Sequence, residues 1–206
     1  MNMDIKEQVK EIKLSFRQMM DGSVAKSMRD KGLTYKLNWG ATLPRLREKA
    51  DAYGKNYDLA IALWKEDVRE CKILATMIMP PDQVLPEVID IWMEQIPSQE
   101  IAEQAAFNLF QHLPYAPEKA YTWMASDKDL YQYCGFHILA RLFMEKREPN
   151  ERGINEFLDQ ALSALQGNSI GVRKAALAAV RRFSELGLVY ERLAKSALKR
   201  ANLDFL

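Results

Sequence analysis

Residues 54–81 read GKNYDLAIALWKEDVRECKILATMIMPP and carry the clearest fold signal in the chain. Apolar residues recur there at three- and four-residue steps, which predicts one helix over residues 57–64 and another over residues 67–79. A glycine precedes the two helices and a pair of prolines follows them. Neither residue type continues a helix readily, so these residues mark the bounds of the segment. The stretch therefore predicts two short helices joined by a tight turn.

Toward the N-terminus the same periodicity marks a first amphipathic helix, at Ile5, Val9, Ile12, Phe16 and Met19. We expect Ser23 to cap a short second helix that ends near Gly32. Residues 33–40 contain aromatic residues and no helical pattern, so they predict an ordered loop. Thr42 is the expected cap of the next helix, with Pro44 in its first turn.

Beyond these segments, further short helices are predicted over residues 44–53, 82–95, 98–113, 117–125, 128–146, 150–166, 169–186 and 189–202. About a dozen short helices with tight connections and no strand alternation predict an all-α fold, an α-solenoid or ARM-repeat-like superhelix. We expect residues 1–206 to form a single domain. Large aromatic side chains at helical spacing are expected in its core: Trp64, Trp92, Phe107, Phe110, Trp123, Phe136, Phe143, Phe157 and Phe183.

Composition argues against a disordered chain, a disulfide-stabilised scaffold and a membrane protein. The 206 residues are 48% hydrophobic and 28% charged, as in folded globular domains, and the net charge of +1 names no partner. Two cysteines, Cys71 and Cys134, fit a reducing compartment rather than a disulfide scaffold. The N-terminus does not resemble a signal peptide and no stretch reaches the apolar length of a membrane span, so we expect a cytoplasmic protein without membrane contact.

Charge is distributed unevenly along the chain. Residues 82–118 contain seven acidic residues and no Lys or Arg, whereas residues 168–206 contain eight basic residues and three acidic ones. Such asymmetry is compatible with a basic face for a polyanion and equally with solvated surfaces. The basic residues of the C-terminal helices are the candidates for contact with such a polyanion: Arg173, Lys174, Arg181, Arg182, Arg192, Lys195 and Lys199.

Four segments taken in order carry a family resemblance: residues 39–47, residues 59–75, residues 123–127, and Arg173-Lys174-Ala175 with Arg181. Their order and spacing, over about residues 24–195, resemble the HEAT-like repeat DNA alkylation-repair family, the AlkD-like DNA glycosylases. The resemblance implies HEAT-like helical repeats and DNA as the partner, duplex, damaged or branched. Glycosylases of this family release alkylated purines, and a carboxylate stabilises the positive charge that develops on the sugar.

The family's carboxylates fall on a "WDxVD" helix start, which best matches Gln99-Glu100-Ile101-Ala102-Glu103 in this sequence. The resemblance therefore makes Glu103 the first candidate catalytic residue and Glu100 the second, with Gln99 in place of the tryptophan. An alignment without a gap puts the key carboxylate at Ser98 instead. A structural interpretation also stands: acidic residues in a first turn favour the helix dipole, with Ser98 as the cap.

Two further family positions differ. An arginine of the family falls at Tyr133, and a late tryptophan falls at Ala178, whereas the arginine that follows is kept as Arg181. These losses favour DNA binding with weak or lost alkylpurine glycosylase activity. An active glycosylase that uses Glu103, with Tyr133 or Trp92 in aromatic contact with the base, is a second hypothesis.

A third hypothesis makes the chain a protein-interaction scaffold whose acidic face, residues 82–118, recruits a partner. The sequence predicts no metal and no cofactor. His112 and His137 are the only histidines, and Cys134 with His137 supplies two ligands where a structural zinc site needs four. The oligomeric state is open.

Overall fold

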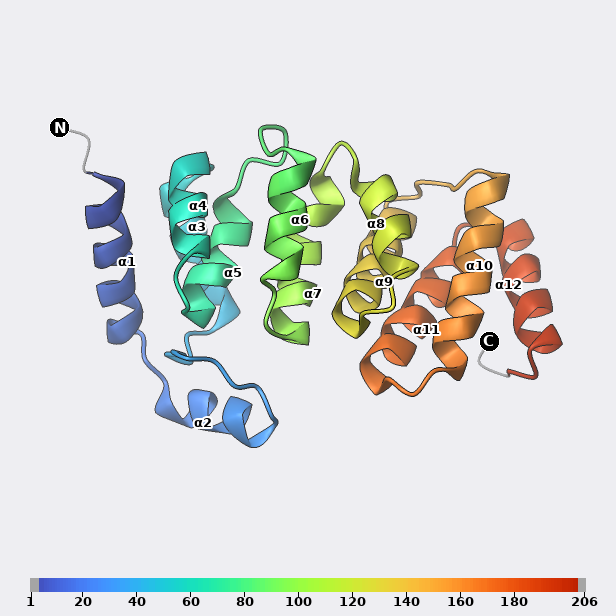
Figure 1. Cartoon of the computed structure of the whole chain (residues 1–206), viewed down its shortest axis with the longest axis horizontal. Coiled ribbons are helices and arrows are strands. Elements are labelled where there is room, and N and C mark those ends of the chain that lie inside the picture. The colour runs from blue at the N-terminus through green and yellow to red at the C-terminus, as the bar shows by residue number, and fades with distance from the viewer. Residues whose placement is uncertain (1–3, 204–206) are drawn as a thin grey trace. The chain divides into compact units, whose positions relative to one another are not determined.

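The computed structural model describes residues 4–203, and their regular structure is helical (Figure 1). Within those residues, α-helices alternate with short connections, and Leu37 and Val68 form an isolated β-bridge. The helices are α1 (Ile5–Gln18), α2 (Gly22–Asp30), α3 (Leu43–Tyr53), α4 (Tyr57–Trp64), α5 (Arg69–Ile78), α6 (Pro86–Glu94), α7 (Gln99–Asn108), α8 (Ala116–Met124), α9 (Asp129–Met144), α10 (Glu151–Gln166), α11 (Ile170–Ser184) and α12 (Leu188–Arg200). The prediction of an all-α fold is confirmed.

Helix contacts divide the chain into two compact units, with the division between Leu109 and Phe110. In the first unit, α5 packs against α3, α4 and α7, and α1 packs against α4. In the second unit, α9 packs against α8 and α11, and α11 also contacts α10 and α12. The single domain expected over residues 1–206 stays a prediction.

Aromatic side chains fill the core of each unit. In the first, the rings of Trp64 and Trp92 stack with centroids 4.2 Å apart and planes 4° from parallel. In the second, Phe143, Phe157 and Phe183 are fully buried and contact one another at centroid distances of 5.1–5.5 Å. Aromatic pairs at such distances add to the stability gained from burial alone. The expected core aromatics are buried except Phe107, which is half-buried.

Several helix starts differ from the sequence prediction. Asp21, not Ser23, caps α2: its carboxylate accepts the backbone N–H groups of Ser23 and Val24 at 3.0 and 3.1 Å. Thr42 is the N-cap residue of α3, but its hydroxyl makes no capping bond. The helix predicted from residue 82 begins only at Pro86, because a residue before proline is held extended and Leu85 has a ψ of 151°.

Two helix ends also differ. The helix predicted over residues 98–113 ends at Asn108, and a 3₁₀ turn over Phe110–His112 follows. Leu109 leaves the helical region, with φ −131° and ψ −57°, and no glycine or proline marks that position. Residue 68, predicted inside a helix, is extended because it bridges to Leu37.

Close helix packing in the second unit depends on one glycine. A Cβ added to Gly135 of α9 would lie 2.6 Å from the backbone nitrogen of Met124 and 2.7 Å from the carbonyl oxygen of Ala120 in α8. The absent side chain therefore permits the approach of these two helices.

Within residues 4–203, none of the helices is both long and apolar enough to cross a bilayer.

Candidate functional site

A buried charged cluster lies at the start of α5, a helix in which nearly every residue is buried. The side chain of Arg69 is 2% exposed, and its Nε and Nη2 atoms donate to the carboxylate of Glu100 at 2.6–3.1 Å. Nη1 donates to the carbonyl oxygen of Ala41 at 3.0 Å and lies 3.2 Å from Glu70. Because a buried guanidinium is tolerated only when its charge and donors are paired, these contacts join α5 to α7 and to the loop before α3.

The same cluster holds the loop over residues 33–42. Glu70 is fully buried and accepts the backbone N–H groups of Trp39 and Ala41 at 3.2 Å. The hydroxyl of Tyr35 donates to Glu100 and lies 2.8 Å from the hydroxyl oxygen of Ser98. The loop predicted from sequence is therefore fixed from both of its ends to helices of the first unit.

Electrostatics keep Glu100 ionised within this cluster. Burial by itself would raise its pKa, but the hydrogen bonds and charge of Arg69, with the Tyr35 hydroxyl, together hold the pKa below the ordinary value of 4.5. Burial and the hydrogen bond to Glu100 raise the pKa of Tyr35 well above 10. Tyr35 therefore remains a neutral donor and Glu100 an anionic acceptor at neutral pH.

The candidate carboxylates thus have different surroundings. Glu100 is engaged by Arg69 and Tyr35 in the core of the cluster, whereas Glu103 is exposed on α7. Ser98 occupies the N-cap position, and its hydroxyl accepts the backbone N–H of Ile101 at 3.3 Å, so the predicted cap is confirmed. The catalytic assignments of Glu100 and Glu103 stay predictions.

The aromatic residues considered for base contact are packed inside their own units. Trp92 is 2% exposed and stacks on Trp64 in the first unit. Tyr133 is 9% exposed in the second unit, and its ring centroid lies 4.4 Å from that of His137. Neither ring presents an open face to solvent.

The predicted DNA-binding residues lie on α11 and α12, two helices in contact, and we call them the C-terminal basic surface. The set is Arg173, Lys174, Arg181 and Arg182 on α11, and Arg192, Lys195 and Lys199 on α12. All are exposed except the half-buried Arg182. Arg182 pairs with Glu185 at 2.7 Å and Lys195 with Glu191 at 2.6 Å.

The remaining members of the C-terminal basic surface lack such pairing. Within residues 4–203, Arg173, Lys174 and Arg181 have no side-chain hydrogen bond or ion pair, and the same holds for Arg192 and Lys199. On α11, Val172, Ala175, Ala176, Ala179, Val180 and Phe183 form the buried face, as expected. Unpaired cations on one side of a packed helix leave their charges available to an external anion.

Ala178 is the residue at which the sequence resemblance placed the family's late tryptophan, and this correspondence stays a prediction. It is exposed on α11, four residues after Lys174 and three before Arg181. Because residues at these spacings share one helix face, the methyl group lies among the cations, where a tryptophan would present a ring. This face of α11 carries cations and no aromatic ring at residue 178.

The carboxylates of the acidic segment over residues 82–118 have different surroundings. Asp82, Glu87 and Glu94 are exposed in the first unit, whereas Glu100 belongs to the buried cluster. Glu118 lies on α8 of the second unit. The proposed acidic docking face therefore has a smaller set of carboxylates than the sequence count indicated.

Cysteine and histidine residues offer no metal site within residues 4–203, where no group of three or more potential ligands occurs. Cys134 is fully buried, and burial raises the pKa of its thiol. Burial likewise raises the pKa of Cys71 to about 12. Both thiols are packed, protonated side chains at neutral pH.

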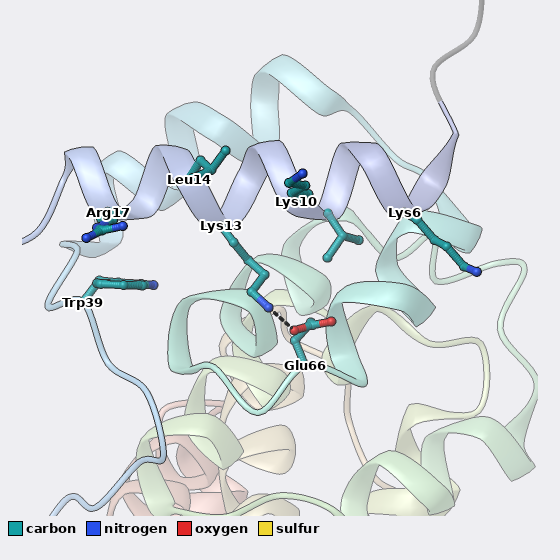
Figure 2. Close-up of a pocket in the computed structure, with 8 residues that line it drawn as sticks. Lys6, Lys10, Lys13, Leu14, Arg17, Trp39 and Glu66 are labelled. Carbon is teal, nitrogen blue, oxygen red and sulfur yellow. Dashed lines mark hydrogen bonds and ion pairs between the residues drawn. The ribbon is translucent and has the colours of Figure 1, made fainter.

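Sequence reasoning missed a second group of cations, on α1. Lys6, Lys10, Lys13 and Arg17 line a pocket of about 410 Å³ together with Val9, Leu14, Trp39 and Glu66 (Figure 2). The sequence contains the pattern that predicts this group: basic residues recur along α1 at four-, three- and four-residue steps, which places them on one face of the helix.

The two units, built of short packed helices, define a HEAT-like helical repeat protein. A solved structure described as a member of "a new family of proteins related to the HEAT-like repeat DNA glycosylases with affinity for branched DNA structures" has the same fold. Its TM-score is 0.83 over 97% of this chain and 83% of that one, with 16% sequence identity. No curated protein gave a significant sequence match.

The family itself follows from sequence. The profile of the DNA alkylation repair enzymes matches residues 12–187, and the chain belongs to that family. The HEAT-like fold and the family resemblance predicted from the quoted segments are thereby confirmed.

Proposed function

We propose that the chain binds DNA through its phosphate backbone, that the C-terminal basic surface makes the contact, and that alkylpurine excision is weak or lost. The observation that carries the proposal is the set of exposed, unpaired cations on α11: Arg173, Lys174 and Arg181. Lys and Arg side chains that neutralise phosphates supply sequence-independent affinity for DNA. Membership of the DNA alkylation repair family makes DNA the expected polyanion.

The kind of DNA is part of the proposal. The structural relative is described as having affinity for branched DNA, and its fold extends over nearly the whole of this chain. Contacts to phosphates position a protein on DNA without reading bases. We therefore expect binding that tolerates any sequence, and we include a branched junction beside a plain duplex among the substrates to be tested.

Reduced glycosylase activity is supported by the surroundings of the candidate residues. Glu100 is held by Arg69 and Tyr35, so its charge is already paired and is not available to a developing sugar cation. Gln99 and Ala178 offer no ring to a cationic base, and Tyr133 is packed against His137. Glu103 is the one candidate carboxylate at the surface of α7.

Binding is tested by fluorescence anisotropy with labelled duplex and junction DNA. The native chain is compared with Arg173→Ala/Arg181→Ala, and with a matched control, Lys26→Ala/Arg29→Ala, which removes the same charge from exposed positions on α2. We expect the α11 variant to bind all sequences more weakly and the control to bind like the native chain. Equal affinity in all three proteins would contradict the proposal.

Excision is tested by release of 7-methylguanine from alkylated duplex DNA. We expect release near the uncatalysed background, because the candidate residues do not combine a free carboxylate with aromatic rings that could hold the base. The active-glycosylase hypothesis makes the opposite prediction: release well above background that Glu103→Gln abolishes. Release that survives this substitution would exclude Glu103 as the catalytic residue.

A further inference from the structure

The pocket beneath α1 is lined by cations that the proposed function does not use. Its cations come from four positions of one helix, Lys6, Lys10, Lys13 and Arg17, and Figure 2 shows their side chains along the side of α1 that borders the pocket. At about 100° per residue, the four positions fall within an arc of roughly 60°. The acidic residues of α1, Glu7 and Glu11, fall outside that arc. The helix therefore segregates its charges by sign.

Pairing within the pocket is incomplete. Glu66 is its only lining carboxylate and is bound by Lys13 at 2.5 Å. Lys6, Lys10 and Arg17 are exposed and have no ion pair within residues 4–203. Four cations thus face one carboxylate. Like charges held together on one face repel each other unless an anion lies between them, so the arrangement favours an anionic ligand.

A second observation points to a ligand with acceptor atoms. The indole Nε1 of Trp39 is buried and has no hydrogen-bond partner, the one such side-chain atom within residues 4–203. In Figure 2 the indole lies beside Arg17, with its nitrogen directed toward Lys13 and Glu66. Buried donors are nearly always paired, so an unpaired one at the wall of a pocket calls for an acceptor from outside the chain. A phosphate oxygen meets that requirement.

The length of the cationic row distinguishes a chain of phosphates from a single small anion. Lys6 and Arg17 are separated by eleven residues, about 16 Å along a helix at 1.5 Å per residue. One phosphate contacts at most a turn of that row, whereas successive phosphates of a nucleic-acid strand, about 3.4 Å apart along a duplex axis, match its whole length. The half-buried ring of Trp39 beside the cations adds an apolar face for a sugar or a base.

We propose that the α1 pocket is a second DNA-backbone contact, in which Lys6, Lys10 and Arg17 bind phosphates spaced along one strand and the Trp39 Nε1–H donates to a phosphate oxygen. The inference rests on the proposed function, since both require DNA as the ligand. It assigns a contact to residues of the first unit, in addition to the C-terminal basic surface of the second. Lys13 remains paired with Glu66 and orients the wall of the pocket.

The test follows the indole N–H signal of Trp39 by ¹H–¹⁵N NMR, assigned with Trp39→Phe, while duplex DNA, single-stranded DNA, inorganic phosphate or an acidic peptide is added. The indole signals of Trp64, Trp92 and Trp123 serve as internal references because those side chains are buried. Lys10→Glu/Arg17→Glu is the test variant, and Lys26→Glu/Arg29→Glu is its charge-matched control. Far-UV circular dichroism checks that each variant is folded.

We expect DNA to shift the Trp39 signal of the native chain and not that of the test variant. The slope of the logarithm of the association constant against the logarithm of salt concentration should be shallower in the test variant by about 1.8, from 0.9 for each of two lost phosphate contacts. Arg173→Ala/Arg181→Ala should keep the shift at higher DNA concentrations. DNA binding by anisotropy with an unmoved Trp39 signal, and with equal affinity in the test variant and its control, would overturn this inference and leave the proposed function standing. A shift produced by phosphate or by acidic peptide, but not by DNA, would overturn it too. Absence of DNA binding in every assay would refute both.

Discussion

Replacing Glu100 by Gln tests whether the buried cluster is a structural element of the first unit. The substitution keeps the size of the side chain and one acceptor oxygen, but it removes the negative charge that faces the Arg69 guanidinium. It also leaves an amide N–H₂ beside a group that can only donate. If Glu100 serves to hold α7, α5 and the loop over residues 33–42 together, this single change should lower the stability of the folded chain.

The expected cost follows from the contacts. Removing one partner of a buried ion pair costs about 3–5 kcal/mol, but the side chain of Glu100 is 19% exposed and Glu70 remains as a counter-ion 3.2 Å from Arg69. We therefore expect a smaller cost than for a fully buried pair, about 2–3 kcal/mol. For a chain of this length each kcal/mol lowers Tm by about 2–4 °C, so the drop should be about 5–10 °C.

Thermal unfolding followed by circular dichroism at pH 7 measures that drop, with Glu94→Gln as the matched control at the end of α6. The control changes an exposed carboxylate and should alter stability by less than about 0.5 kcal/mol. Equal Tm values for the native chain and Glu100→Gln, or a drop as large in the control, would refute a structural role for the cluster.

The pH dependence has a definite sign. Because the folded-state pKa of Glu100 lies below its ordinary value of 4.5, its contribution is fully present above pH 4.5 and is lost as pH falls through the lowered pKa. The difference in Tm between the native chain and Glu100→Gln should therefore be constant between pH 6 and 8 and narrow below about pH 4. A difference that widens on acidification would contradict the assignment.

Two further predictions concern packing. Gly135→Ala should destabilise the second unit by about 3 kcal/mol in urea unfolding, because the new Cβ meets α8 backbone at 2.6 Å, whereas Gly22→Ala, with nothing within 4 Å, should change stability by less than about 0.5 kcal/mol. Similar losses in both would be inconsistent with the described helix contact. Cys71 and Cys134, both buried with raised thiol pKa values, should resist iodoacetamide at pH 8 and react in urea; rapid modification of the folded chain would exclude that packing.

The helical fold could be predicted from local sequence because its signals are local. The α4 helix over Tyr57–Trp64 was predicted with its observed bounds, since Gly54 precedes it and its apolar residues recur at helical spacing. Errors occurred where tertiary contacts override the pattern, as at residue 68, which pairs with Leu37 in an isolated bridge. The end of α7 at Asn108 has no breaker in the sequence, so it could not be foreseen.

The candidate site was harder to predict because its main contacts join distant residues. Arg69 and Glu100 lie 31 positions apart, and Tyr35 and Glu100 lie 65 apart, so no local spacing reveals the cluster. One clue was available: Arg69 and Glu70 stand directly before a run rich in apolar residues, Ile73 to Ile78, where a buried charge would need a partner, since unpaired charges are almost never buried. The α11 cations could be predicted because helical periodicity alone separates them from the buried face.

The salt dependence of duplex binding tests the central claim most directly. The logarithm of the association constant is measured against the logarithm of salt concentration for the native chain and for Arg173→Ala/Arg181→Ala. If both arginines bind phosphates, the native slope is steep and the variant slope is shallower by about 1.8, from 0.9 for each lost contact. Identical slopes, or no binding by the native chain at low salt, would contradict the assignment of the C-terminal basic surface to DNA.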